Sequence, residues 1–148
     1  MITNLMVLAL AAQLASGLPD ADEPRISFTL VHDNLVVIPV FLNGQGPYHF
    51  LVDTGATHSI LSSRVAEQLN VLPARKGSLI SAAGAVPVTI GMIEIVQIGS
   101  VRIAKTSIAV TALDLFRTLH VDGLLGADYL KQFKISIDYT NHVLSLQR

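Results

Sequence analysis

One short segment of the sequence brings together residue types that could carry out acid–base chemistry. The apolar run Phe50–Val52 is followed at once by Asp53, Thr54 and Gly55. An apolar strand would fix the carboxylate in a low dielectric, and the glycine would let the backbone turn so that amide groups point back at it. The Thr54 hydroxyl could brace the loop. Taken alone, Asp-Thr-Gly is more typical of an ordinary turn after a strand.

A second segment favours the chemical interpretation over the ordinary turn. About seventy residues further on, Leu124–Gly126 forms an apolar stretch that ends in glycine and leads into a predicted helix, Asp128–Phe133. A glycine-containing hairpin around Ser81–Ala85 lies between the two segments. The order and spacing of these features resemble the retropepsin-like aspartic proteases of the bacterial and cellular type, the single-lobe relatives of pepsin. The resemblance covers nearly the whole of the expected folded part, from about Leu35 to Leu146.

This resemblance implies both a fold and a set of site residues. The fold would be all-β, a closed barrel-like retropepsin fold with a flap hairpin and one or two short helices. Asp53 would be the catalytic carboxylate, and Thr54 and Gly55 would complete the catalytic triplet. Substrate would be bound by Ala56, Thr57, Ala82, Ala83, Gly84 and Ala85, and the site would be supported from behind by Leu124, Leu125 and Gly126.

The sequence supplies one such motif, whereas peptide hydrolysis of this kind needs two carboxylates. Two carboxylates about 3 Å apart cannot both ionise, so they share a proton and can serve as base and acid. Asp122 and Asp128 do not qualify as the second, because neither is followed by a hydroxyl residue and a glycine. On the resemblance, the chain would be an aspartic endopeptidase acting on peptides or unfolded proteins as a homodimer, with water activated between the two Asp53 side chains.

Two coupled positions depart from the retroviral pattern. Retroviral members commonly carry an Asp two residues after the glycine of the triplet and an Arg after the later glycine, and these form an ion pair. Here these two positions hold Thr57 and Ala127, so both members of the ion pair are absent and no unpaired charge is left. This pattern points to the cellular or bacterial branch of the family. Ala56 also lacks the hydroxyl that a Ser would offer to the carboxylate, and we therefore expect activity at mildly rather than strongly acidic pH.

Other chemistries find less support. The five histidines lack the helical spacing of a metal site, and the chain has no cysteine, so neither a metal nor a cofactor is expected. His58 could line a subsite or be an ordinary exposed residue. Ten Lys and Arg against eleven Asp and Glu give no electrostatic footprint for nucleic acid. The alternative from another class is a retropepsin-fold module that no longer cuts and serves in dimerisation or peptide binding.

The chain of 148 residues, 51% of them hydrophobic, has room for one domain. Residues 1–17 contain the apolar run Leu5–Ala12 and no charged side chain, and we expect a signal peptide or a membrane anchor there. Residues 18–25, rich in Pro and acidic residues, would be a linker, and the protease-like domain would occupy residues 26–148. The protein would then be secreted or periplasmic, or, if residues 1–19 are retained, anchored to a membrane.

Many short strands with turns about every ten residues are typical of a barrel-like all-β domain. Strands are predicted over Ile26–Val31, Leu35–Leu42, Tyr48–Val52, Gly77–Ala82, Val86–Ile98, Val101–Val110, Phe133–Tyr139 and His142–Leu146. Turns are predicted at Asn43–Pro47 and, as the tip of the flap, at Ala83–Ala85. Short helices are predicted over Arg64–Leu69, capped by Ser62 or Ser63, and over Asp128–Phe133, capped by Asp128, with one helical turn at Asp114–Arg117.

Overall fold

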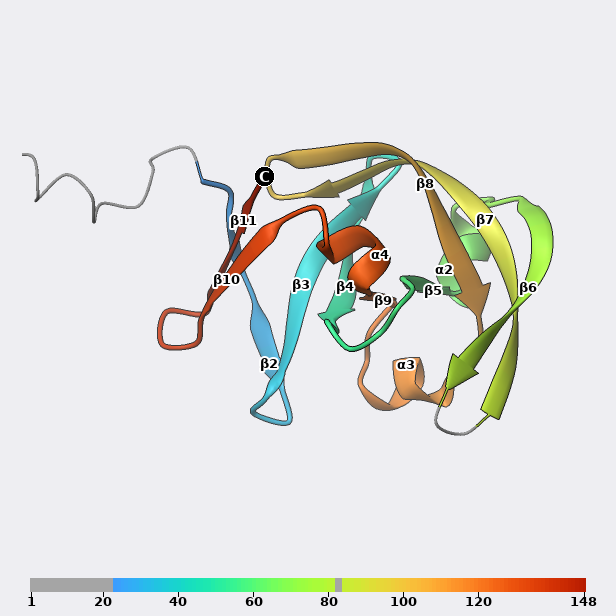
Figure 1. Cartoon of the computed structure of the whole chain (residues 1–148), viewed down its shortest axis with the longest axis horizontal. Coiled ribbons are helices and arrows are strands. Elements are labelled where there is room, and N and C mark those ends of the chain that lie inside the picture. Colours follow the sequence, from blue (N-terminus) through green and yellow to red (C-terminus); the bar gives the residue numbers. More distant parts are fainter. Residues whose placement is uncertain (1–22, 82–83) are drawn as a thin grey trace, which may run out of the picture.

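The computed structural model describes residues 23–81 and 84–148, and this part of the chain is built mainly from strands (Figure 1). The expected signal peptide or anchor and most of the expected linker lie outside the described residues, as do Ala82 and Ala83. Among the described residues, no helix has the length and apolar character needed to cross a membrane.

The elements follow one another along the chain as short units. The strands are β1 (Arg25–Ser27), β2 (Thr29–Val31), β3 (Leu35–Leu42), β4 (Gln45–Val52), β5 (Ile60–Ser62), β6 (Pro73–Ser81), β7 (Gly84–Ile98), β8 (Val101–Thr111), β9 (Gly123–Leu125), β10 (Lys134–Asp138) and β11 (Val143–Gln147). The helices are α2 (Ser63–Gln68), α3 (Asp114–Thr118) and α4 (Ala127–Leu130).

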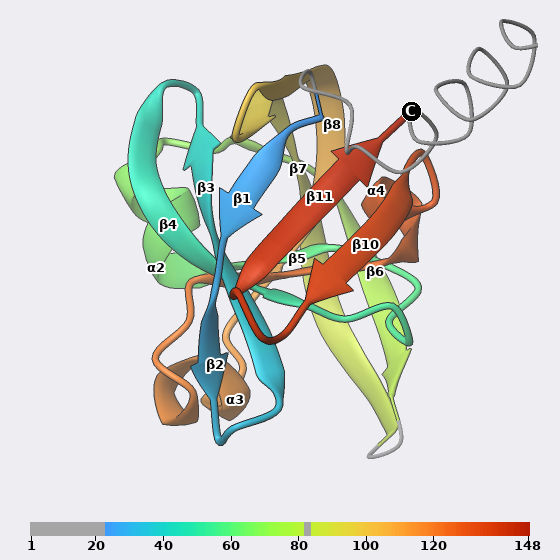
Figure 2. The same cartoon turned by 90° about the vertical axis from the view of Figure 1, so that its left-hand side faces the viewer.

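The strands form two sheets. Eight of them follow the order β2-β3-β4-β9-β5-β8-β7-β6, and an additional pairing of β3 with β7, which sets Phe41 opposite Gln97, joins the sheet into a ring. Strands β1, β11 and β10 form a separate three-stranded sheet, which faces the viewer in Figure 2. The all-β class is confirmed. The large sheet is ring-like, and β2 and β6 continue it beyond the ring as edge strands.

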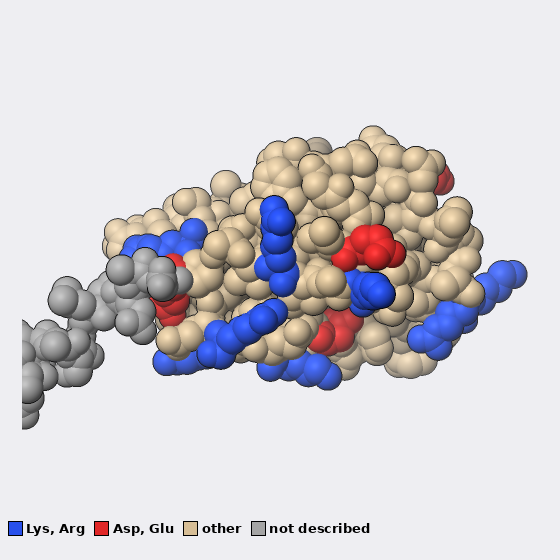
Figure 3. Space-filling view, turned by 90° about the horizontal axis from the view of Figure 1, so that it is seen from above, with Lys and Arg blue, Asp and Glu red and all other residues tan. Residues whose placement is uncertain are grey.

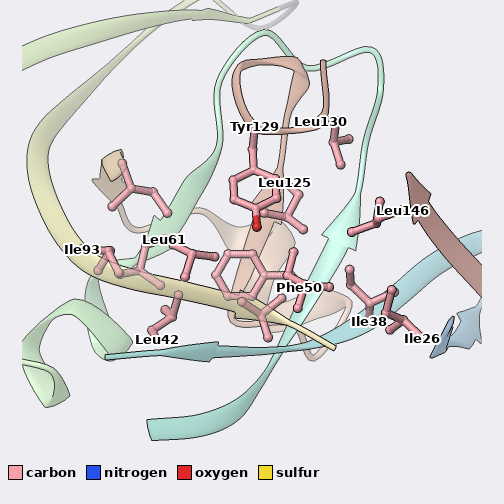
Figure 4. Close-up of a cluster of buried hydrophobic side chains, with 14 of the residues drawn as sticks. Ile26, Ile38, Leu42, Phe50, Leu61, Ile93, Leu125, Tyr129, Leu130 and Leu146 are labelled. Carbon is pink, nitrogen blue, oxygen red and sulfur yellow. The ribbon is translucent and has the colours of Figure 1, made fainter. Parts of the chain in front are cut away.

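The strand that precedes Asp53 is apolar on both faces because a hydrophobic cluster lies on each side of it. Along β4, Phe50 belongs to the larger cluster and its neighbour Leu51 to a smaller one that also holds Val37 and Leu124. Figure 4 shows Phe50 next to Leu125 in the larger cluster. Burying a side chain of this size stabilises the fold by about 1.5–3 kcal/mol. The end of β4 is therefore fixed from both sides.

Several sequence-based strand boundaries were wrong. The predicted strand Ile26–Val31 is two strands: the Phe28 amide still donates to His142 O at 3.0 Å, in register with β11, whereas the chain from Thr29 onward pairs with β3, so β1 and β2 join different sheets. Strand β6 begins at Pro73 rather than Gly77, and Gly84 and Ala85, predicted in the turn at the flap tip, already belong to β7. Strand β4 begins at Gln45, since Asn43 and Gly44 already complete the turn. Both have positive φ, 52° and 77°, as two-residue hairpin turns require.

The helices are confirmed in place, but α4 ends at Leu130 rather than Phe133, and its predicted cap is also corrected. The Ser62 side chain caps α2 by accepting a hydrogen bond from the Val65 amide at 3.4 Å. Helix α4 starts at Ala127 with Gly126 as its N-cap, so Asp128 is not the cap that the sequence predicted. The carboxylate of Asp128 instead reaches a neighbouring loop. The helical turn at residue 114 is a third short helix, α3.

The surface seen from above in Figure 3 is mostly uncharged. Lys and Arg side chains lie scattered over this face, with Asp and Glu side chains between them.

Candidate active site

Asp53 follows directly on β4 and is held there by the neighbouring strand. Strands β4 and β9 pair in parallel with Val52 opposite Leu125, and the Asp53 amide continues the ladder by donating to Leu125 O at 3.0 Å. Because β9 is buried, and β4 is buried at Phe50 and Leu51 just before the carboxylate, the backbone that carries Asp53 has little freedom to move. The residues Leu124 and Leu125, expected to support the site, lie in this position behind Asp53.

The loop after β4 turns two backbone amides toward the carboxylate. Gly55 N donates to Asp53 Oδ1 at 2.9 Å, and Ala56 N donates to the same oxygen at 3.2 Å. A Cβ on Gly55 would lie 3.3 Å from Oδ1, a tight contact that glycine avoids. The two amides thus point back at the carboxylate as expected, although Gly55 is not among the glycines with positive φ. One oxygen of the half-buried Asp53 is fixed in this way.

The same loop rests on the start of α4. Ala127 N donates to Ala56 O at 2.7 Å, and Asp128 N donates to Thr57 O at 3.2 Å. Gly126 lies so close to the loop that a Cβ there would come within 2.6 Å of the backbone of His58. A glycine is therefore needed at position 126, in agreement with the supporting position expected for it.

Two polar residues that sequence reasoning missed complete this support. Ser59 is only 2% exposed, and its hydroxyl donates to Asp128 Oδ1 at 2.7 Å and accepts from Gly126 N at 3.0 Å. The Asp128 carboxylate also accepts from the Ser59 amide, at 2.9 and 3.0 Å to its two oxygens. The available signal was that Ser59 and Asp128 are polar residues next to apolar ones. These two residues are 69 positions apart, and a single sequence gives no reason to pair them.

A cleft of about 670 Å³ opens beside Asp53. The loop Asp53–His58 forms one side, and the arms of the β6–β7 hairpin form another through Leu79, Ile80 and Val86. The remaining lining comes from Ile60, Thr111 and Leu113. The cleft is therefore a largely apolar space with a carboxylate at its edge.

The sequence-predicted residues divide into those at the cleft and those away from it. Asp53, Gly55, Ala56 and Thr57 line it, whereas the exposed Thr54 does not. On the hairpin, Gly84 pairs with Ser81 and Ala85 pairs with Ile80. Neither Gly84 nor Ala85 lines the cleft, although Ile80 does. Ala82 and Ala83 lie outside the described residues.

The other carboxylate considered from the sequence has a structural role. Asp122 accepts hydrogen bonds from the His49 amide at 2.9 Å and from the Arg64 guanidinium, and thereby ties β4 to α2. Within residues 23–81 and 84–148, no three His, Cys, Asp or Glu side chains are grouped so that they could hold a metal ion. The lining of the cleft itself holds two ionisable side chains among the described residues, Asp53 and the exposed His58.

Comparisons with known proteins agree with this geometry. The family model described as "gag-polyprotein putative aspartyl protease" matches residues 38–132, which include the Asp53 loop, the β6–β7 hairpin and β9. Among curated proteins, none matches the sequence.

Solved structures share the fold. A retropepsin-like aspartic protease from Rickettsia conorii is 24% identical with a TM-score of 0.57, over 84% of this chain and 88% of that one. The EIAV protease complexed with the inhibitor HBY-793 is 22% identical with a TM-score of 0.54, over 70% and 92%. The retroviral protease-like domain of Ddi1 from Leishmania major is 23% identical with a TM-score of 0.52, over 76% and 92%.

The family model spans more than half of the chain and contains each segment that builds the cleft. The chain therefore belongs to the retropepsin-like aspartic protease family.

Proposed function

We propose that the protein is an aspartic endopeptidase that hydrolyses peptide bonds as a homodimer. The observation that carries this proposal is the Asp53 carboxylate at the edge of an apolar cleft, with one oxygen held by the amides of Gly55 and Ala56. Such a carboxylate is fixed in position while its second oxygen stays available to water or to substrate.

The mechanism needs a second carboxylate, which a second copy of the chain would supply. With the two Asp53 side chains at a two-fold axis, one is ionised and takes a proton from the bound water, and the other is protonated and donates to the scissile carbonyl oxygen. The exposed Thr54, directly beside Asp53 but outside the cleft, would brace the loop of the partner chain in such a dimer.

The β6–β7 hairpin would act as the flap of this site. Its arms supply Leu79, Ile80 and Val86 to the cleft, and Ile80 is 86% exposed in the single chain. An extended peptide that enters the cleft would cover these side chains and could bond the hairpin backbone as an added strand does. The apolar lining favours large apolar side chains around the scissile bond.

The test compares wild type with Asp53→Asn on an unfolded protein and on peptides with apolar residues at the cut. We expect Asp53→Asn to lower kcat/KM by about 10²–10⁴-fold, because the amide can neither take up nor share the proton. Asp33→Asn, at the exposed β2–β3 turn, is the matched control and should behave as wild type.

Equal hydrolysis by wild type and Asp53→Asn would contradict the proposal. If neither protein cleaves anything, the remaining reading is a retropepsin-fold module for dimerisation or peptide binding.

We also propose that residues 1–17 direct the chain out of the cytoplasm, as a cleaved signal peptide or as a retained anchor. The support is the uncharged apolar run Leu5–Ala12. Expression in a secreting bacterial host and mass measurement of the product check this: a mass that begins near residue 18 in the periplasm fits cleavage, and a membrane-bound full-length chain fits an anchor. A full-length chain in the cytoplasm would contradict both.

A further inference from the structure

The lining of the Asp53 cleft contains one ionisable side chain besides Asp53 itself. This side chain is His58, which lies at the end of the catalytic loop and is exposed. The other described lining residues are apolar, small or carry a hydroxyl, and none of them is Lys, Arg or Glu. A charged group on a bound peptide would therefore find one basic partner in the cleft, and that partner is His58.

The backbone on both sides of His58 is fixed by the same residue. Asp128 N donates to Thr57 O at 3.2 Å, and the Asp128 carboxylate accepts from the Ser59 amide at 2.9 Å. Gly126 packs against the His58 backbone itself. Because the backbone of His58 is already held in place, its exposed side chain can bind a ligand with little loss of backbone entropy.

The imidazole is also oriented by a neighbour. Thr57 Oγ1 and His58 Nδ1 lie 2.9 Å apart, within hydrogen-bond distance. This contact occupies Nδ1 and leaves Nε2 for another partner. When the ring is protonated, or when Nδ1 accepts from the Thr57 hydroxyl, Nε2 carries a hydrogen and is a donor. The natural partner for that donor is a carboxylate oxygen.

We infer that His58 is a specificity residue whose Nε2 binds an acidic side chain, Glu or Asp, of the peptide substrate. This inference rests on the proposed endopeptidase function and narrows its substrates to apolar cleavage sites flanked by acidic residues.

Two-fold symmetry makes the inference more specific. A homodimer places one His58 on each side of its axis, and the scissile bond lies at that axis. An extended peptide therefore meets two such imidazoles, the same number of residues before and after the cut. The acidic preference is expected at two substrate positions equally distant from the scissile bond, rather than at one.

The test uses peptides with a fixed apolar pair at the cut and with Glu, Gln or Lys placed in turn at four positions on each side. For each position, kcat/KM is measured at pH 5.5, and the ratio of the Glu peptide to the Lys peptide is compared among variants. In wild type we expect a ratio of about ten at one position on each side, the size of a partly exposed charge pair set against a like-charge contact.

The variants assign this ratio to His58. His58→Gln should bring the ratio close to one at both positions, and His58→Glu should invert it. His32→Gln changes an exposed histidine on the β2–β3 turn and should keep the wild-type ratio. A wild-type ratio within twofold of one at every position, or a ratio that His58→Gln retains, would overturn the inference.

Failure of the endopeptidase proposal is distinguishable from failure of this one. If wild type cuts no peptide, the affinities of Glu and Lys peptides are measured by fluorescence polarisation in the Asp53→Asn background. Tighter binding of the Glu peptide that is lost in Asp53→Asn/His58→Gln supports the role of His58 in a binding module, and equal affinities overturn it.

Discussion

At Asp53, backbone groups contribute as much to the site as side chains do. Strand β4 positions the carboxylate, the amides of Gly55 and Ala56 donate hydrogen bonds to it, and β9 pairs with the end of β4 and restrains it. The sequence predicted the strand and the two amides because they lie within a few residues of Asp53, whereas the support from β9, about seventy residues further on, was expected only from the family resemblance. The Ser59–Asp128 contact could not be predicted, since it joins the loop after β4 to the first turn of α4, two segments that meet only after folding.

The Ser59 hydroxyl offers a test at the scale of one residue. Ser59→Ala removes the acceptor of the buried Gly126 amide and the donor to Asp128, so the free energy of unfolding should fall by about 1–3 kcal/mol. Urea unfolding measures this loss. Ser59→Thr keeps the hydroxyl and should retain most of the stability. A loss below about 0.5 kcal/mol in Ser59→Ala would show that the contact does not hold the loop.

At the scale of elements, the apolar pattern predicted most strands but not where they change sheets. A continuous apolar run marked β3, and shorter apolar runs marked the end of β4 and parts of β7, because these segments face a core; turn residues marked most of the strand ends. The break at Phe28 left no such signal, because a strand passing from one sheet to another keeps its alternating pattern. The start of α4 was misplaced for a related reason. An Asp near a helix start is typical of a cap, whereas Asp128 bonds the neighbouring loop.

Helix α4 contributes a buried tyrosine with a measurable effect on stability. The Tyr129 ring packs in the larger cluster, and its hydroxyl, visible in Figure 4 near Phe50 and Leu125, has no hydrogen-bond partner among the described residues. Burial raises the pKa of Tyr129 to about 12, an effect that the charge of Arg148 partly offsets. The ionised form is thus disfavoured in the folded state.

This raised pKa predicts a loss of stability in alkali. Above pH 10 the tyrosine ionises in the unfolded chain but stays protonated in the folded one, so the free energy of unfolding should fall between pH 10 and about 12, by about 2–3 kcal/mol in total. Tyr129→Phe should remove this contribution and be equally or more stable at pH 7, because no buried hydroxyl is left unpaired. Urea unfolding from pH 8 to 11.5 measures both effects.

Tyr139→Phe is the control for this measurement, since Tyr139 is 53% exposed. Its stability should follow the wild-type pH dependence. If the free energy of unfolding fell as steeply with pH in Tyr129→Phe as in wild type, the assignment to Tyr129 would be contradicted.

At the scale of the whole molecule, each chain of the proposed enzyme supplies one of the two catalytic carboxylates. If each copy supplies one essential carboxylate, activity depends on the square of the fraction of intact chains. Equal amounts of wild type and Asp53→Asn, differently tagged and allowed to exchange subunits at random, should retain about a quarter of the activity. Peptide cleavage by the mixture, with tag pull-down to verify exchange, measures this. Retention of half the activity would mean that a single chain cuts on its own.

The pairing of distant segments also sets the order of events during synthesis. Strand β1 pairs with β11, Arg25 opposite Ser145, and the loop after Asp53 finds its bonding partners only at residues 125–128. A growing chain therefore carries Asp53 through about seventy further residues before the groups that hold its loop have been made. If the chain is the protease proposed above, its catalytic site cannot assemble before residue 128 has been synthesised, and shorter nascent chains would be inactive.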